Sequence, residues 1–107
     1  MANETLSGVV IESHESLTFE EYCVAIKIER EVIIEMIEYE LIQPQGTRPE
    51  EWRFDSASLK RGRMAASFYH DLEINLQGIA LAFDLLDQIK DLKKQVELLE
   101  KIDKIQE

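Results

Sequence analysis

The sequence contains little cysteine, proline or glycine. Its single cysteine, Cys23, cannot form an internal disulfide, so nothing points to an oxidising compartment. There is no Cys-x-x-Cys pair, and the two histidines, His14 and His70, are isolated from each other, which argues against a zinc site. The lone glycines Gly46 and Gly78 do not form a phosphate-binding loop, and we expect Gly78 to let another helix approach closely.

Long apolar runs are also absent. The first seven residues are mostly polar, and the run "GVVI" that follows is far too short for the apolar region of a signal peptide. No other run approaches the length of a membrane span. We therefore expect a cytoplasmic protein.

Positive charge is scarce. Twelve Lys and Arg residues oppose 22 Asp and Glu residues, which gives a net charge of −10. Such a chain repels nucleic acid and anionic membranes at long range and attracts basic protein surfaces. With 107 residues, 45% of them apolar, we expect one small domain that dimerisation would help to stabilise.

The first half of the chain shows signals for one strand and two helices. The β-branched residues 8–12 predict a strand. Thr18 and Glu21 have the spacing of a capping box, so a helix should begin at Phe19 and run through "FEEYCVAI". A second helix should follow a short turn and end near Leu41, because Pro44 disfavours helix in the residue before it.

The second half should hold a loop over residues 43–51, a short strand and two more helices. The strand "WRF" (52–54) is expected to pair with residues 8–12 and to turn its aromatics toward the core. Asp55 and Asn75 are plausible N-caps for helices over about 56–71 and 75–104.

The last helix carries a heptad pattern typical of a coiled coil. Residues 75–86 should pack on their own domain, whereas residues 89–105 should meet a partner helix. This divides the chain into a domain at 1–74 and a long helix at 75–107. The residues expected to form a homodimer are Leu85, Ile89, Leu92, Val96 and Leu99.

The second helix is acidic on one side. Glu31, Glu35 and Glu38 form a stripe opposite a broad apolar side, and residues 29–40 hold five Glu and one Arg, a net charge of −4. Helices that read DNA present cations and amides, so this one is ill suited to DNA. The stripe is either a solvated face or a docking face for a basic protein, with Ile34 as an apolar contact at its edge.

A weaker cationic group lies downstream. Residues 48–63 hold five cations and three carboxylates, a net charge of +2, which is less than a DNA-binding domain usually shows. We take this group as a second candidate surface for a protein partner. Of its five cations, the four that we assign to this surface are Arg53, Lys60, Arg61 and Arg63.

The sequence contains no convincing catalytic site. Cys23 falls on an amphipathic helix and is better explained as a small buried hydrophobe than as a reactive thiol. Asp84, Asp87 and Asp91 share a helix face without a phosphate loop or oxyanion donor nearby, so they are interpreted as a solvated face. We expect neither enzymatic activity nor a cofactor or metal.

The order of the elements resembles the MerR-like winged helix-turn-helix group. Within that group, "EEWRFD" (50–55) and "DLEINLQGIALAFDLLDQI" (71–89) are similar to blocks of the CbpM family of chaperone modulators. The resemblance covers roughly residues 9–92 and implies a mainly α fold: a winged helix-turn-helix with a small two-stranded sheet and a long C-terminal helix. Three residues depart from the pattern, since Glu40 and Glu73 replace glycines and Glu29 replaces a serine cap.

The resemblance also implies a partner. CbpM-like proteins bind the J-domain of CbpA, a DnaJ-like co-chaperone, and inhibit its stimulation of the chaperone DnaK; they can also reduce its DNA binding. J-domains carry a basic helix that engages DnaK, and the acidic stripe has the charge to compete for it. The alternative is a MerR-like transcriptional regulator, which would need DNA contacts from Arg30, Arg48, Arg53 and Lys60.

Overall fold

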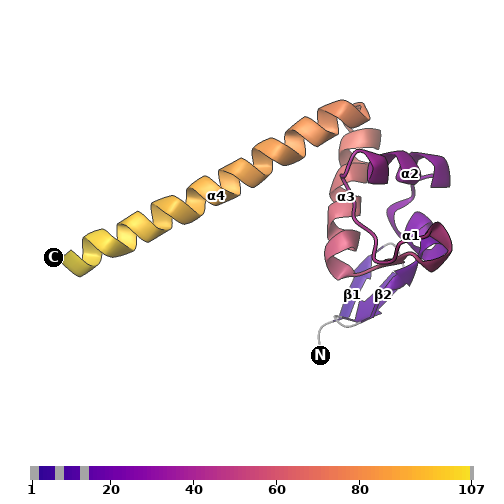
Figure 1. The fold of residues 1–107 in the computed structure, drawn as a ribbon, viewed down its shortest axis with the longest axis horizontal. Helices are drawn as coiled ribbons and strands as arrows, with labels where there is room; N and C mark the ends of the chain where they lie inside the picture. Colours follow the sequence, from indigo (N-terminus) through magenta and orange to yellow (C-terminus); the bar gives the residue numbers. More distant parts are fainter. Residues whose placement is uncertain (1–2, 7–8, 13–14, 107) are drawn as a thin grey trace.

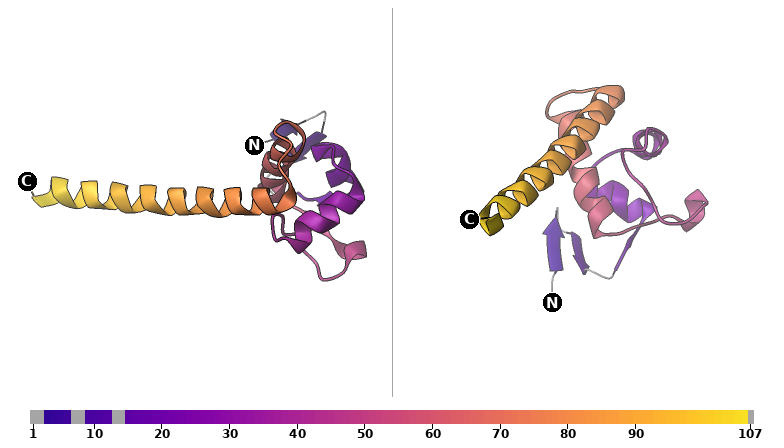
Figure 2. Two further views of the ribbon diagram at one scale, coloured as in Figure 1. Left: turned by 90° about the horizontal axis from the view of Figure 1, so that it is seen from above. Right: turned by 60° about the vertical axis from the view of Figure 1, so that its left-hand side comes forward.

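A mainly helical body and one long helical arm make up the computed structural model, which describes residues 3–6, 9–12 and 15–106 (Figure 1). Among the described residues, the body holds three α-helices and one short 3-10 helix. A fourth α-helix leaves the body as a straight arm (Figure 2). The elements, in chain order, are β1 (Asn3–Leu6), β2 (Val9–Glu12), β3 (Leu17–Thr18), α1 (Phe19–Ile26), α2 (Arg30–Glu38), the 3-10 helix η1 (Pro49–Glu51), β4 (Arg53–Phe54), α3 (Ser56–His70) and α4 (Leu76–Gln106).

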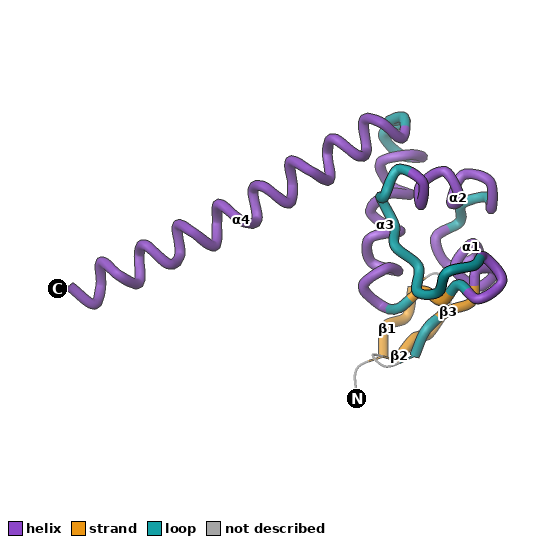
Figure 3. Tube along the Cα trace, in the orientation of Figure 1, coloured by secondary structure: helices purple, strands orange, loops and turns teal. Residues whose placement is uncertain are grey.

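Two small antiparallel sheets replace the single pairing expected from the sequence (Figure 3). β2 pairs with β1 in a hairpin, and β4 pairs with β3, so the prediction that residues 52–54 pair with residues 8–12 was wrong. The physical reason is burial: Leu17 of β3 lies opposite Phe54 of β4, and both side chains are buried in the core. The sequence alone could not distinguish pairing with residues 8–12 from pairing with β3, because the choice depends on which side chains reach the core.

The predicted helix starts are confirmed by their capping bonds. The Thr18 hydroxyl accepts from the Glu21 backbone N–H, and the Glu21 carboxylate accepts from the Thr18 N–H, which completes a capping box. The Asp55 carboxylate caps α3 by accepting from the Ser58 N–H. Asn75 Oδ1 accepts from the Gly78 N–H at the start of α4.

Aromatic rings pack α1 against β4 and the residue before it. Tyr22 and Phe54 stack with ring centroids 4.0 Å apart, and neither is exposed. Trp52 is only half-buried and meets the Phe19 ring edge-on at 5.4 Å. The expectation that Trp52 and Phe54 both turn toward the core is therefore confirmed, with Trp52 at the margin of the core.

Close helix packing depends on Gly62 rather than on Gly78. A Cβ on Gly62 would lie 2.0 Å from the Tyr22 hydroxyl, so α1 and α3 approach each other only because this side chain is absent. A Cβ on Gly78 would meet Ile74 and Asn75, which belong to the turn just before α4. The expectation that Gly78 admits another helix was therefore wrong.

Each junction between helices contains a non-glycine residue in the left-handed conformation. Lys27 ends α1 with φ 59°, Glu40 follows α2 with φ 62°, and Glu73 joins α3 to α4 with φ 53°. These values confirm that Glu40 and Glu73 occupy turns suited to glycine. Glu29, at the N-cap of α2, makes no side-chain capping bond.

Replacing Glu73 by glycine should stabilise the fold. The left-handed conformation costs a non-glycine residue about 1–2 kcal/mol, which the glycine would avoid. The greater conformational freedom of glycine in the unfolded chain would offset about 0.4–1 kcal/mol of this gain in stability. We therefore expect Glu73→Gly to raise the free energy of unfolding in urea by roughly 0.5–1 kcal/mol. The control is Glu97→Gly in the middle of α4, which should lower it by about 1 kcal/mol. A loss of stability in Glu73→Gly would contradict the strain argument.

The arm begins inside the body and then leaves it. Leu76, Ile79 and Phe83 on the first turns of α4 are buried in the core. From Asp84 to Ile105 every residue is exposed. These residues form about 30 Å of solvent-exposed α-helix, at about 1.5 Å per residue.

Candidate protein-binding surfaces

The acidic stripe lies on the outer side of α2. Ile33 and Met36 on the opposite side are fully buried, which fixes the rotation of the helix. Glu31, Glu35 and Glu38 are all exposed, and within the described part of the chain none of them forms a hydrogen bond or an ion pair. Three carboxylates without counter-ions form a surface that attracts cations.

Ile34 lies beside the stripe with 37% of its surface exposed. It can therefore supply an apolar contact next to the carboxylates, as the sequence predicts. The only cation of α2, Arg30, is engaged inside the molecule: its guanidinium pairs with Glu20 at 2.7 Å and stacks 4.6 Å from the centre of the Phe19 ring. This leaves the face of α2 without a free cation in the part of the chain that the structure describes.

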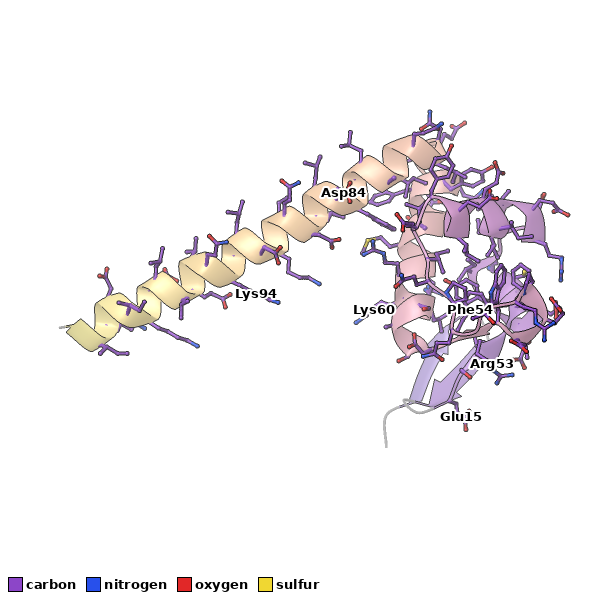
Figure 4. All side chains as sticks on the ribbon, viewed as in Figure 1. Glu15, Arg53, Phe54, Lys60, Asp84 and Lys94 are labelled. Atoms are coloured by element: carbon purple, nitrogen blue, oxygen red, sulfur yellow. The ribbon has the colours of Figure 1, made fainter. Side chains whose placement is uncertain are left out.

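The structure does not bring the four residues of the cationic group together. Arg53 donates to the Ser16 carbonyl at 2.8 Å and lies away from α4, whereas Lys60 lies on the side of α3 that faces α4 (Figure 4). Arg63 on α3 is half-buried. Lys60 and Arg61 instead lie with Lys90 and Lys93 of α4 around one groove. This set was missed in the sequence, because it is brought together only by the angle between α3 and α4.

Arg61 of α3 contacts two other segments of the chain. Its Nε donates to the Leu41 carbonyl at 3.0 Å, its guanidinium lies 4.2 Å from the centre of the Phe83 ring, and Nη1 is 3.8 Å from the Asp87 carboxylate. The side chain therefore connects the end of α2, α3 and the start of α4. Its charge is largely committed within the chain, which reduces what it can offer to a partner.

The predicted dimerisation residues form an exposed apolar seam on the arm. Their exposed fractions run from 48% at Ile89 to 64% at Leu99. At about 100° per residue, they lie about 120–180° around α4 from Phe83, the last buried residue. The seam therefore points away from the body. Its members are Leu85, Ile89, Leu92, Val96 and Leu99.

The described residues offer no clustered groups for chemistry. Among them, no three His, Cys, Asp or Glu side chains gather as metal ligands. Cys23 is half-buried, and burial raises the pKa of its thiol, which keeps it protonated and poorly nucleophilic. His70 lies 3.3 Å from the Lys27 carbonyl, and His14 is outside the described residues. No helix in the described ranges is long and apolar enough to cross a membrane.

Comparison with known proteins identifies the family. The family described as MerR HTH family regulatory protein matches residues 17–101. A chaperone modulatory protein CbpM of Coxiella burnetii (strain Dugway 5J108-111) is 46% identical over 103 residues, which cover 96% of this chain and 97% of that protein. The chain belongs to the CbpM family.

More distant members of the CbpM family agree with this assignment. The chaperone modulatory protein CbpM of Pseudomonas putida (strain W619) is 32% identical over 77 residues, which cover 72% of this chain and 76% of that protein. The relatives of the CbpM family are named as modulators rather than as enzymes. The match over residues 17–101 includes the helix-turn-helix and most of the arm, so the MerR-like fold deduced from the sequence is confirmed.

Proposed function

We propose that this chain is a chaperone modulator that binds the J-domain of a CbpA-type co-chaperone and inhibits its stimulation of DnaK. The observation that carries the proposal is the exposed stripe of Glu31, Glu35 and Glu38 on α2. The J-domain of such a co-chaperone presents a basic helix to DnaK, and a surface of opposite charge would cover that helix. Occlusion needs no covalent chemistry, only a complementary surface.

The arrangement of α2 supports this role in two ways. The helix backbone is anchored to the core, because Ile33 and Met36 are fully buried, so only the side chains of the stripe have to be ordered on contact. Their side chains are also not paired with cations within the described residues, so a partner does not have to displace an internal ion pair. Ile34 adds apolar area at the edge of the stripe.

Reversing the charge of the stripe should weaken J-domain binding. For Glu35→Lys with Glu38→Lys we expect at least about a tenfold loss of affinity and a smaller dependence on salt, because two attractive charges become repulsive. The measurement is calorimetric titration with the J-domain of the CbpA-type protein at two salt concentrations. Co-chaperone-stimulated DnaK ATPase activity would report the inhibition.

The matched control is Asp84→Lys with Asp91→Lys, which changes the net charge equally on the outer side of the arm. Both aspartates are exposed and lie off the seam. We expect nearly unchanged affinity for this control. If the stripe variant keeps its affinity, or the control loses as much, the stripe is not the contact. If the unaltered protein does not bind a functional J-domain at all, the proposed function fails.

DNA-binding regulation is the second candidate, favoured by the helix-turn-helix family match. The charges oppose it, because the outward side of α2 is acidic. Three of the four cations that would be needed are engaged within the chain, since Arg30 pairs with Glu20, Arg48 pairs with Glu51 and Arg53 donates to Ser16. Saturable binding of duplex DNA at physiological salt would revive it.

We also propose that the protein is a homodimer through the seam of α4. The seam lies outside the body, is continuous over two heptads and would otherwise leave five large aliphatic side chains in water. A dimer of this kind would carry two acidic stripes, one on each body.

A further inference from the structure

A groove opens in the angle between α3 and α4. Its volume is about 580 Å³, and its apolar part consists of Ala57, Met64, Phe83, Leu86 and Ile89. Met64, Leu86 and Ile89 are 45%, 41% and 48% exposed. The methionine side chain is flexible and adapts to its neighbours, so the groove can accommodate a row of apolar side chains of different shapes.

The rim of the groove is cationic. Lys60 and Arg61 stand on the α3 side, and Lys90 and Lys93 stand on the α4 side. Asp87 is the one carboxylate of the lining, so four cations and one anion give a local charge of +3 on a chain of net charge −10. Lys60, Lys90 and Lys93 are exposed and form no hydrogen bond or ion pair within the described ranges.

The proposed dimer seam shares one residue, Ile89, with this groove. At about 100° per residue, Leu86, Lys90 and Lys93 lie about 20–80° from Phe83 around α4, on the side of the body. The seam lies on the other side of the helix, and only Ile89 stands at the edge of both surfaces. A homodimer through the seam therefore leaves the rest of the groove open.

We propose that this groove is a docking site for an acidic amphipathic helix of a protein partner. The apolar face of such a helix would cover Met64, Leu86 and Ile89, while its flanking carboxylates would meet Lys60 on one side and Lys90 and Lys93 on the other. Helices that enter apolar grooves are recognised in this way. The site is separate from the acidic stripe and has the opposite charge, so the inference does not rest on the proposed J-domain contact.

The test uses a fluorescein-labelled synthetic peptide as the probe. The peptide is helical, with leucines at positions i, i+4 and i+7 and glutamates on both flanks, and a second peptide has lysines in place of the glutamates. Fluorescence anisotropy is measured with the full chain and with Lys60→Glu plus Lys93→Glu. The control, Lys101→Glu plus Lys104→Glu, makes the same charge change near the far end of the arm.

We expect saturable binding of the acidic peptide and not of the basic one. The groove variant should bind at least about tenfold more weakly, and the control should stay within about twofold. Met64→Ser, which removes apolar floor without changing charge, should weaken binding about fivefold. Circular dichroism checks that each variant is folded.

Three results would overturn the proposal. The acidic peptide could fail to saturate up to about millimolar concentration. The control could weaken binding as much as the groove variant, which would indicate unspecific attraction to lysine. Light scattering could show that Met64→Ser halves the mass of the protein, in which case a second copy covers the groove.

Discussion

Replacing Gly62 by alanine should lower the free energy of unfolding by about 2 kcal/mol. The new Cβ would lie 2.0 Å from the Tyr22 hydroxyl and 2.7 Å from its Cζ, so either the ring or a helix must move. Tyr22 cannot move freely, because it is fully buried, stacks on Phe54 and donates to the Ser58 carbonyl at 2.6 Å. Overpacking at such a site costs about 1–3 kcal/mol and the loss of the hydrogen bond adds about 1 kcal/mol, while the higher helix propensity of alanine offsets about 1 kcal/mol.

Urea unfolding followed by circular dichroism measures this effect. Gly78→Ala serves as a matched control, since its Cβ would meet side chains of the preceding turn and alanine favours helix. We expect its stability to change by less than about 1 kcal/mol. Tyr22→Phe removes the nearest atom, so adding it to Gly62→Ala should recover part of the loss. Near-wild-type stability of Gly62→Ala alone would contradict the close approach of α1 and α3.

The seam variant Ile89→Asp with Leu92→Asp should convert a dimer into a monomer. Each substitution would place an unpaired carboxylate in an apolar interface, which together should raise the dimer dissociation constant at least a hundredfold, about 3 kcal/mol. Because both residues are exposed in the single chain, the body should remain folded. Multi-angle light scattering at micromolar protein gives the mass.

Lys94→Gln with Lys101→Gln is the matched control for the seam. It changes the net charge by the same amount, at exposed heptad positions outside the seam. We expect this variant to keep the mass of the unaltered protein. If the seam variant also keeps that mass, or if the unaltered protein is already monomeric, the seam does not join two copies.

Local signals in the sequence predicted the helices well. The capping box at Thr18 and Glu21 and the N-caps Asp55 and Asn75 depend on neighbours three residues away, so the sequence alone was enough to place three helix starts. The acidic stripe also followed from helical periodicity, and the structure confirms its exposure.

Features that join distant segments could not be predicted. The pairing of β4 depends on Leu17 meeting Phe54 across 37 residues of chain, and the need for glycine at position 62 depends on Tyr22 of another helix. The cationic groove likewise exists only at the observed angle between α3 and α4. In each case the deciding contact is tertiary, and no window of sequence contains both partners.

The contacts of Arg61 have a consequence for the whole assembly. Its guanidinium contacts the Leu41 carbonyl, the Phe83 ring and the Asp87 carboxylate at the point where α4 leaves the body. A small change in the angle between α4 and the body at these contacts would displace the far end of α4 by a much larger distance, because the helix extends for tens of ångströms, about 1.5 Å per residue. In the proposed dimer, the distance and orientation between the two bodies would depend on Arg61, a residue outside the seam.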